Sequence, residues 1–216
     1  MKKLTHPMYP VLAGCGLWLL VATGCSSLPD CTQFPSSPLP RGDDASALIS
    51  EGDMLRDRAH ITLFKQMDWP RGYCQATDAE KYYRYVLENL EPHNAYAMVN
   101  LGYLALMRAY GAKGSEKEVQ LGTAYARLKQ ALELRPGYAT AHVYLGEYYI
   151  LRNEFDKASK EYDLLLDAGI VDSYIYTWAG YAAKKAGRAT EAKQYFRKSV
   201  ERGDREVSSS WARKNM

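Results

Sequence analysis

A pattern of small residues repeats at an interval of 34 positions in this chain, from Gly146 to Gly180 (180 − 146 = 34). In each unit an alanine follows the glycine and an aromatic residue follows the alanine at the same distances. Such an interval is typical of stacked helical hairpins, none of which can bury its apolar face alone. The sequence therefore predicts an all-α array. The alanine and aromatic pairs are Ala158 with Tyr162 and Ala192 with Phe196.

An earlier unit shows the same order of residues at a longer spacing. Gly102 follows a leucine, and Ala124 matches the alanine position, but Gly102 lies 44 positions before Gly146 (146 − 102 = 44). The ten extra residues fall between Met107 and Gln120. We interpret them as longer helices and a longer turn within one hairpin.

These units resemble the tetratricopeptide repeat. The resemblance implies a superhelical solenoid of antiparallel helix pairs, with units over residues 94–136, 138–171 and 172–204 and a cap helix over 205–216. Small residues are expected where the two helices of a hairpin cross, and Tyr162 and Phe196 are expected to fill the gap toward the next hairpin. The small positions are Gly102, Ala124, Gly146, Ala158, Gly180 and Ala192.

Residues 44–92 carry a weaker helical pattern, which we interpret as a degenerate hairpin that caps the array. Trp69–Gly72 contains Pro and Gly and predicts a break between two helices. Thr77–Glu80 has the spacing of a capping box and predicts the start of the second helix there.

The first 24 residues have the features of an export signal. Lys2 and Lys3 precede the uncharged stretch 9–24, which has the length of a secretory hydrophobic region. Residues 21–25 resemble the lipobox of bacterial lipoproteins, which implies a cleaved signal over 1–24 and a lipid on Cys25. Cys15 is an alternative lipid site, and an uncleaved helical anchor is another alternative. Ser26 after the cysteine implies, by the same resemblance, sorting to the outer membrane with the domain facing the periplasm.

Residues 25–43 are rich in Pro and Ser and predict a tether between the anchor and the folded part. Cys31 and Cys74 remain after cleavage, and in an oxidising compartment such a pair usually forms a disulfide. A loop of 44 residues, counted inclusively (74 − 31 + 1), gives roughly 4 kcal/mol in the chain-entropy model. Two free thiols are the alternative.

Charge and motifs argue against several classes of function. Cleavage removes two lysines, so the net charge falls from +3 to 28 − 2 − 25 = +1, and no basic patch for nucleic acid is expected. Motifs for metal hydrolysis, serine hydrolysis, phosphate cradling and thiol redox chemistry are missing from the sequence. We therefore expect no enzyme, no metal, no cofactor and no small-molecule substrate.

The resemblance also implies a concave groove lined by the first helix of each repeat. Tyrosine suits such a surface because it offers a large contact area and a polar tip at low entropic cost. The groove is expected to bind an extended or helical peptide. The alternative is that these tyrosines pack against one another and against the cap helices. The predicted groove residues are Tyr96, Val99, Tyr103, Leu106, Val143, Glu147, Tyr174, Tyr181 and Lys184.

The layout of lipobox, tether and repeats predicts a non-enzymatic scaffold anchored to the outer membrane. By resemblance, its partners are proteins of the cell envelope, and its role is assembly of a type IV or Flp pilus or a secretin. The alternative is an adaptor that regulates a peptidoglycan hydrolase.

Overall fold

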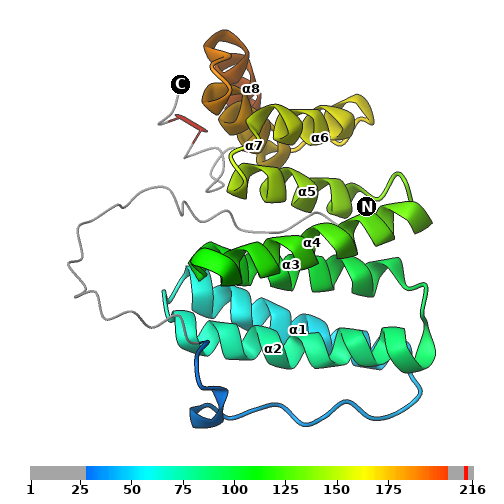
Figure 1. The fold of residues 1–216 in the computed structure, drawn as a ribbon. Coiled ribbons are helices and arrows are strands. Elements are labelled where there is room, and N and C mark those ends of the chain that lie inside the picture. The colour runs from blue at the N-terminus through cyan, green and yellow to red at the C-terminus, as the bar shows by residue number, and fades with distance from the viewer. Residues whose placement is uncertain (1–27, 204–211, 214–216) are drawn as a thin grey trace, which may run out of the picture. The chain divides into compact units, whose positions relative to one another are not determined.

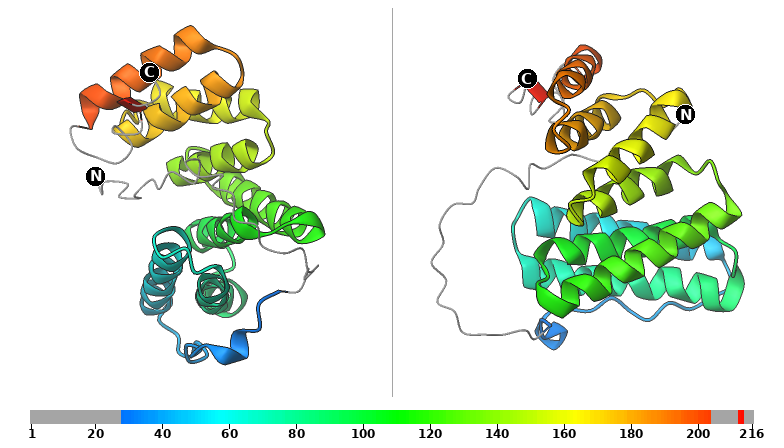
Figure 2. Two further views of the ribbon diagram at one scale, coloured as in Figure 1. Left: turned by 90° about the vertical axis from the view of Figure 1, so that its left-hand side faces the viewer. Right: turned by 45° about the horizontal axis from the view of Figure 1, so that its top comes forward.

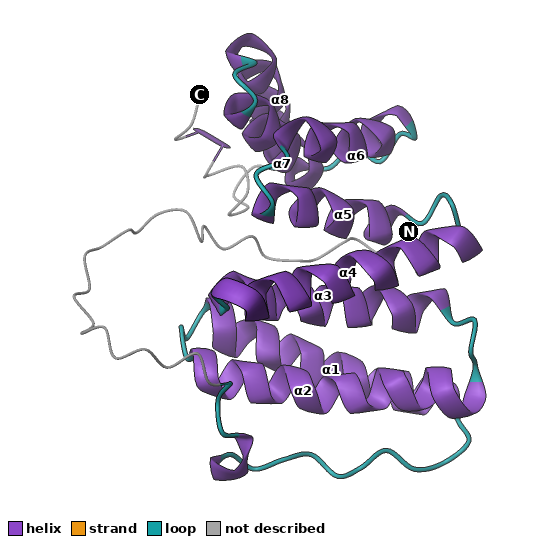
Figure 3. Ribbon diagram, in the orientation of Figure 1, coloured by secondary structure: helices purple, strands orange, loops and turns teal. Residues whose placement is uncertain are grey.

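The computed structural model of the protein describes residues 28–203 and 212–213, and it confirms the predicted all-α class. After an extended segment over residues 28–43, the described chain forms helices joined by short turns, and no strand occurs in that part of the chain (Figures 1 and 3). None of the described helices is both long and apolar enough to cross a membrane. The helices are α1 (Ala45–Phe64), α2 (Trp69–Tyr85), α3 (Ala95–Gly111), α4 (Gly114–Leu134), α5 (Ala139–Leu151), α6 (Phe155–Asp167), α7 (Ser173–Lys185) and α8 (Ala189–Arg202), with a short 3-10 turn η1 (Cys31–Gln33) and a π-helical turn η2 (Val86–Leu90).

The helices belong to two compact units, and the boundary between them in the chain follows Tyr144, within α5. In the N-terminal unit, α1 pairs with α2 and α3 pairs with α4, and α2 also packs on α3. Figure 2 shows these two hairpins side by side. In the C-terminal unit, α7 packs on both α6 and α8. The expected signal peptide and the lipid site at Cys25 lie outside the described residues.

Polar side chains begin several of these helices. Each cap side chain accepts hydrogen bonds from backbone N–H groups of the first turn, which have no partner within the helix. The caps are Asp44 for α1, Asp68 for α2, Asn94 for α3 and Asp172 for α7.

The predicted break between two helices occurs at residues 65–68, just before Trp69–Gly72, because α2 already begins at Trp69. The Asp68 carboxylate accepts a hydrogen bond from the backbone N–H of Arg71, and Pro70 lies in the first turn, where its missing N–H costs nothing. The predicted helix start at Thr77 is wrong. Thr77 lies in the middle of α2, and its hydroxyl donates to the backbone carbonyl of Tyr73 at 3.1 Å.

The ten extra residues of the first repeat lengthen its helices and leave its turn short. Helices α3 and α4 have 17 and 21 residues, whereas α5, α6 and α7 have 13 each. Only Ala112 and Lys113 separate α3 from α4. The added end of α3 packs on the start of α2, since the indole of Trp69 occupies the space beside Gly111 that a Cβ would need.

The repeat glycines lie where the two helices of a hairpin touch. A Cβ at Gly180 would lie 2.5 Å from the ring of Phe196, and one at Gly146 would overlap the ring of Tyr162. Each ring therefore packs on the glycine of its own hairpin, which differs from the expected position toward the next hairpin. At Gly102, Leu128 takes the corresponding place. The alanines of the pattern, Ala124, Ala158 and Ala192, are buried.

Most of the expected cap segment 205–216 lies outside the described residues. Of the part that is described, Ala212 is helical and fully buried. It belongs to an apolar cluster with Ala183, Ala192 and Phe196. The apolar face at the end of the last hairpin is therefore covered at this point.

Candidate interaction surfaces

The predicted groove surface of α3 is closed in the structure. Val99, Tyr103 and Leu106 expose 1%, 5% and 0% of their area, and Val143 exposes 2%. Tyr96 is the exception at 36%. The prediction that the four buried side chains face a ligand is therefore wrong for this conformation of the unit.

A stack of rings accounts for the burial of Tyr103. Its ring lies 4.4 Å from that of Tyr144, at an interplanar angle of 10°. On the α1 side its hydroxyl shares a 2.5 Å hydrogen bond with His60 Nδ1, and the His60 ring packs on Phe64 at 5.0 Å. Within this unit, the alternative interpretation describes Tyr103 correctly, because it packs against another tyrosine and the N-terminal hairpin.

A polar network joins α1, α2 and α3 beneath Tyr96. The Asp53 carboxylate accepts hydrogen bonds from Tyr83 at 2.6 Å and Tyr96 at 2.7 Å, and it pairs with Arg56 at 2.8 Å. Arg56 also donates to the Asn100 side chain at 2.5 Å. Burial raises the pKa of the Tyr83 hydroxyl, so it remains a donor. The N-terminal hairpin is thus joined to the first repeat by hydrogen bonds, of which the one between Arg56 and Asn100 is buried.

In the C-terminal unit the predicted groove residues divide into buried and accessible ones. Glu147 exposes 5% and Tyr181 exposes 7% of their area, while Tyr174 is half-buried and Lys184 is exposed. The Tyr174 hydroxyl donates to the Glu147 carboxyl at 2.5 Å. Burial raises the pKa of the Glu147 carboxyl to about 7, and the hydrogen bond from Tyr174 opposes this shift. Tyr181 packs edge-on against Trp178, with ring centroids 5.7 Å apart.

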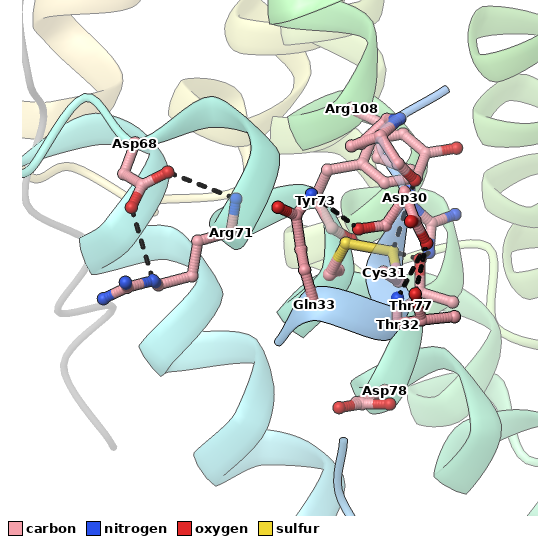
Figure 4. Close-up of a disulfide and its surroundings, with 12 residues drawn as sticks. Asp30, Cys31, Thr32, Gln33, Asp68, Arg71, Tyr73, Thr77, Asp78 and Arg108 are labelled. Carbon is pink, nitrogen blue, oxygen red and sulfur yellow. Dashed lines mark hydrogen bonds and ion pairs between the residues drawn. A yellow bond between two sulfur atoms is a disulfide. The ribbon is translucent and has the colours of Figure 1, made fainter. Parts of the chain in front are cut away.

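Residues 28–43, which we call the strap, form a second candidate surface together with α2. The prediction of a free tether is wrong for these residues, because they contact α2 along its length. A disulfide joins Cys31 in the strap to Cys74 in α2 (Figure 4). The Arg71 guanidinium lies over the ring of Phe34, 5.7 Å from its centroid.

Three hydrogen bonds continue the contact along α2. The Asp78 carboxylate accepts from the backbone N–H of Ser37 at 2.9 Å. The hydroxyls of Tyr82 and Tyr85 donate to the carbonyls of Pro38 and Gly42 at 3.1 and 3.2 Å. The partners on α2 are spaced by three or four residues, so they lie on one face of the helix. This face, the α2 stripe, consists of Arg71, Cys74, Asp78, Tyr82 and Tyr85.

Sequence reasoning missed the α2 stripe because it began the helix at Thr77. A helix that starts at Trp69 places the cysteine, the carboxylate and the two tyrosines on a common face. The predicted disulfide between Cys31 and Cys74 was the signal that could have indicated this contact, because it brings residues 28–43 next to α2. In the described part of the chain, no group of three or more acidic, His or Cys side chains is arranged to hold a metal ion.

Comparison with known proteins agrees with this architecture. The tetratricopeptide repeat family matches residues 117–177, from α4 into α7. A thermophilic tetratricopeptide-repeat protein of Thermus thermophilus is similar in structure, with a TM-score of 0.58 and 18% identity over 80% of this chain and 98% of that chain. MamA protein matches with a TM-score of 0.36 and 20% identity over 73% of this chain and 90% of that chain, too weakly to bear on the fold. No curated protein matches. The chain therefore has the fold of a tetratricopeptide solenoid, and the family match covers one segment of it.

Proposed function

We propose that the protein is a non-enzymatic scaffold that binds other proteins of the cell envelope. The observation that carries the proposal is the tetratricopeptide fold, because stacked hairpins present extended surfaces suited to protein partners. Among the predicted groove residues, the candidates for contact are Tyr96 on the N-terminal unit and, separately, Tyr174 and Lys184 on the C-terminal unit.

The finer proposal places the scaffold on the periplasmic face of the outer membrane, anchored by a lipid on Cys25. It is supported by the lipobox and by the charged start of the chain. Cells labelled with a palmitate analogue should lose the label in a Cys25→Ala variant and keep it in a Cys15→Ala variant. The reverse result would assign the lipid to Cys15. If the wild-type protein takes up no label, the lipid anchor is excluded.

We further propose that the scaffold assists assembly of a type IV or Flp pilus or a secretin. Deletion of the gene should lower the amount of assembled pilus or secretin at unchanged amounts of the subunits. The rate of cell-wall hydrolysis is measured in the same deletion strain, because the alternative role is that of an adaptor for a peptidoglycan hydrolase. Normal assembly together with altered hydrolysis would favour the adaptor.

A further inference from the structure

The α2 stripe contacts the strap mainly through the strap's backbone. Each of its three hydrogen bonds ends on a backbone N–H or carbonyl, those of Ser37, Pro38 and Gly42. Prolines keep such a segment extended and restrict its unbound states. The stripe is therefore a surface for an extended chain, and Cys74 and Arg71 select a cysteine followed three residues later by an aromatic side chain.

The strap lies on the α2 stripe without becoming buried. None of its residues is buried, and Leu39 exposes 66% of its area. By contrast, Cys74, Asp78 and Tyr82 on the stripe expose 5%, 7% and 6%. Little apolar area holds the strap in place, so the disulfide is the principal link between strap and stripe.

The strap joins α1 through a flexible point. Gly42 has a φ of +115°, which favours glycine, and a Cβ at this position would meet nothing within 4 Å. The cap of α1 follows directly at Asp44. A rotation near Gly42 can therefore redirect the strap without disturbing α1, which is the kind of hinge that exchange of an element between copies requires.

We propose that the α2 stripe is a self-association site, at which the strap of a second copy replaces the resident strap. The exchanged dimer contains two Cys31–Cys74 bonds between copies in place of two bonds within copies. Disulfide bonds are thus conserved, and no net oxidant or reductant is consumed. A small thiol starts the exchange: its thiolate attacks one disulfide, forms a mixed disulfide and releases a cysteine thiolate, and it is released when the new bond closes. This inference goes beyond the scaffold function and does not depend on the lipid anchor.

Two single-cysteine copies test the proposal. One full-length copy carries Cys31→Ser and supplies the stripe; the other carries Cys74→Ser and supplies the strap. Both also carry Cys15→Ser and Cys25→Ser, so no other thiol reacts. The copies are mixed in detergent with reduced and oxidised glutathione, with one copy labelled with ¹⁵N. Mass spectrometry without reduction should find mainly the Cys31–Cys74 pair between copies, well above the two-to-one-to-one ratio of random coupling.

The control compares one pair of substitutions placed in either copy. Tyr82→Phe and Tyr85→Phe in the stripe-supplying copy weaken the resident strap and the incoming strap equally, so the yield of the linked pair should stay unchanged. The same substitutions in the strap-supplying copy loosen the strap that must leave its own stripe, and they should raise the yield by up to about fivefold for each hydrogen bond. A random ratio of linked pairs, or the same change in both placements, would overturn the proposal.

Discussion

The buried carboxyl of Glu147 should make the stability of the protein depend on pH in a defined direction. Its pKa is raised from 4.5 to about 7 in the folded state, and in the unfolded chain it returns to its ordinary value. Between these pH values the folded state binds more protons than the unfolded state. The stability contributed by this proton is therefore complete below pH 4.5 and is lost as the pH rises to about 7.

The size of the effect follows from the shift. A displacement of 2.5 pKa units (7 − 4.5) corresponds to roughly 3 kcal/mol in the free energy of unfolding. Glu147→Gln keeps the shape of the side chain and an acceptor for Tyr174 while removing the ionisation. The variant should match the wild type near pH 4.5 and exceed it by up to about 3 kcal/mol above pH 7.

Urea unfolding followed by far-UV circular dichroism, at several values between pH 4.5 and pH 8, measures this difference. The quantity of interest is the variant minus the wild type, because pH effects of all other groups cancel in it. Glu201→Gln, at an exposed position in α8, is the matched control and should show a difference close to zero throughout. If the difference for Glu147→Gln is the same at both ends of the pH range, the argument from burial is refuted.

Three further substitutions test the packing. Gly146→Leu should lower the melting temperature and cost roughly 1–3 kcal/mol or more, because the new side chain meets an aromatic ring; thermal unfolding measures it. Tyr103→Ala should destabilise the protein by about 3 kcal/mol in urea, whereas Tyr125→Ala, at 38% exposure, should change stability little. Arg56→Met should cost about 1–3 kcal/mol, because it leaves the buried side-chain oxygen of Asn100 without its donor and half-buried Asp53 without its cation. Exposed Arg58→Met on the same helix is the control for urea unfolding. Equal effects in either matched pair would count against the assigned contacts.

The repeat architecture could be predicted from sequence because close helix contacts tolerate only small residues. Gly146 and Gly180 face aromatic rings, so any side chain there would clash, and the requirement is visible as a period in the sequence. The start of α2 could not be predicted in the same way. Pro70 is compatible both with a break and with a first helical turn, and the choice depends on whether Asp68 caps the helix.

The candidate surfaces were harder to predict, for two different reasons. Position in the repeat indicates which way Tyr103 points, but it does not reveal that His60, 43 positions earlier, lies against it. The contact between strap and α2 leaves almost no pattern in the strap sequence. Side chains of α2 bond to backbone groups of the strap, and every residue has such groups. A Pro- and Ser-rich composition is therefore shared by free tethers and by segments that lie on a helix.

If Cys25 carries the proposed lipid, the Cys31–Cys74 bond also limits how far the lipid can lie from α2. With the bond closed, six backbone steps separate the lipid from α2, a reach of at most about 20 Å. If the bond is opened and the strap leaves α2, nineteen steps separate the lipid from Asp44, a reach of about 65 Å. The disulfide would then set the distance between the membrane and the folded helices. The closed bond would restrict binding to partners close to the membrane surface, and the open bond would allow binding to partners deeper in the periplasm.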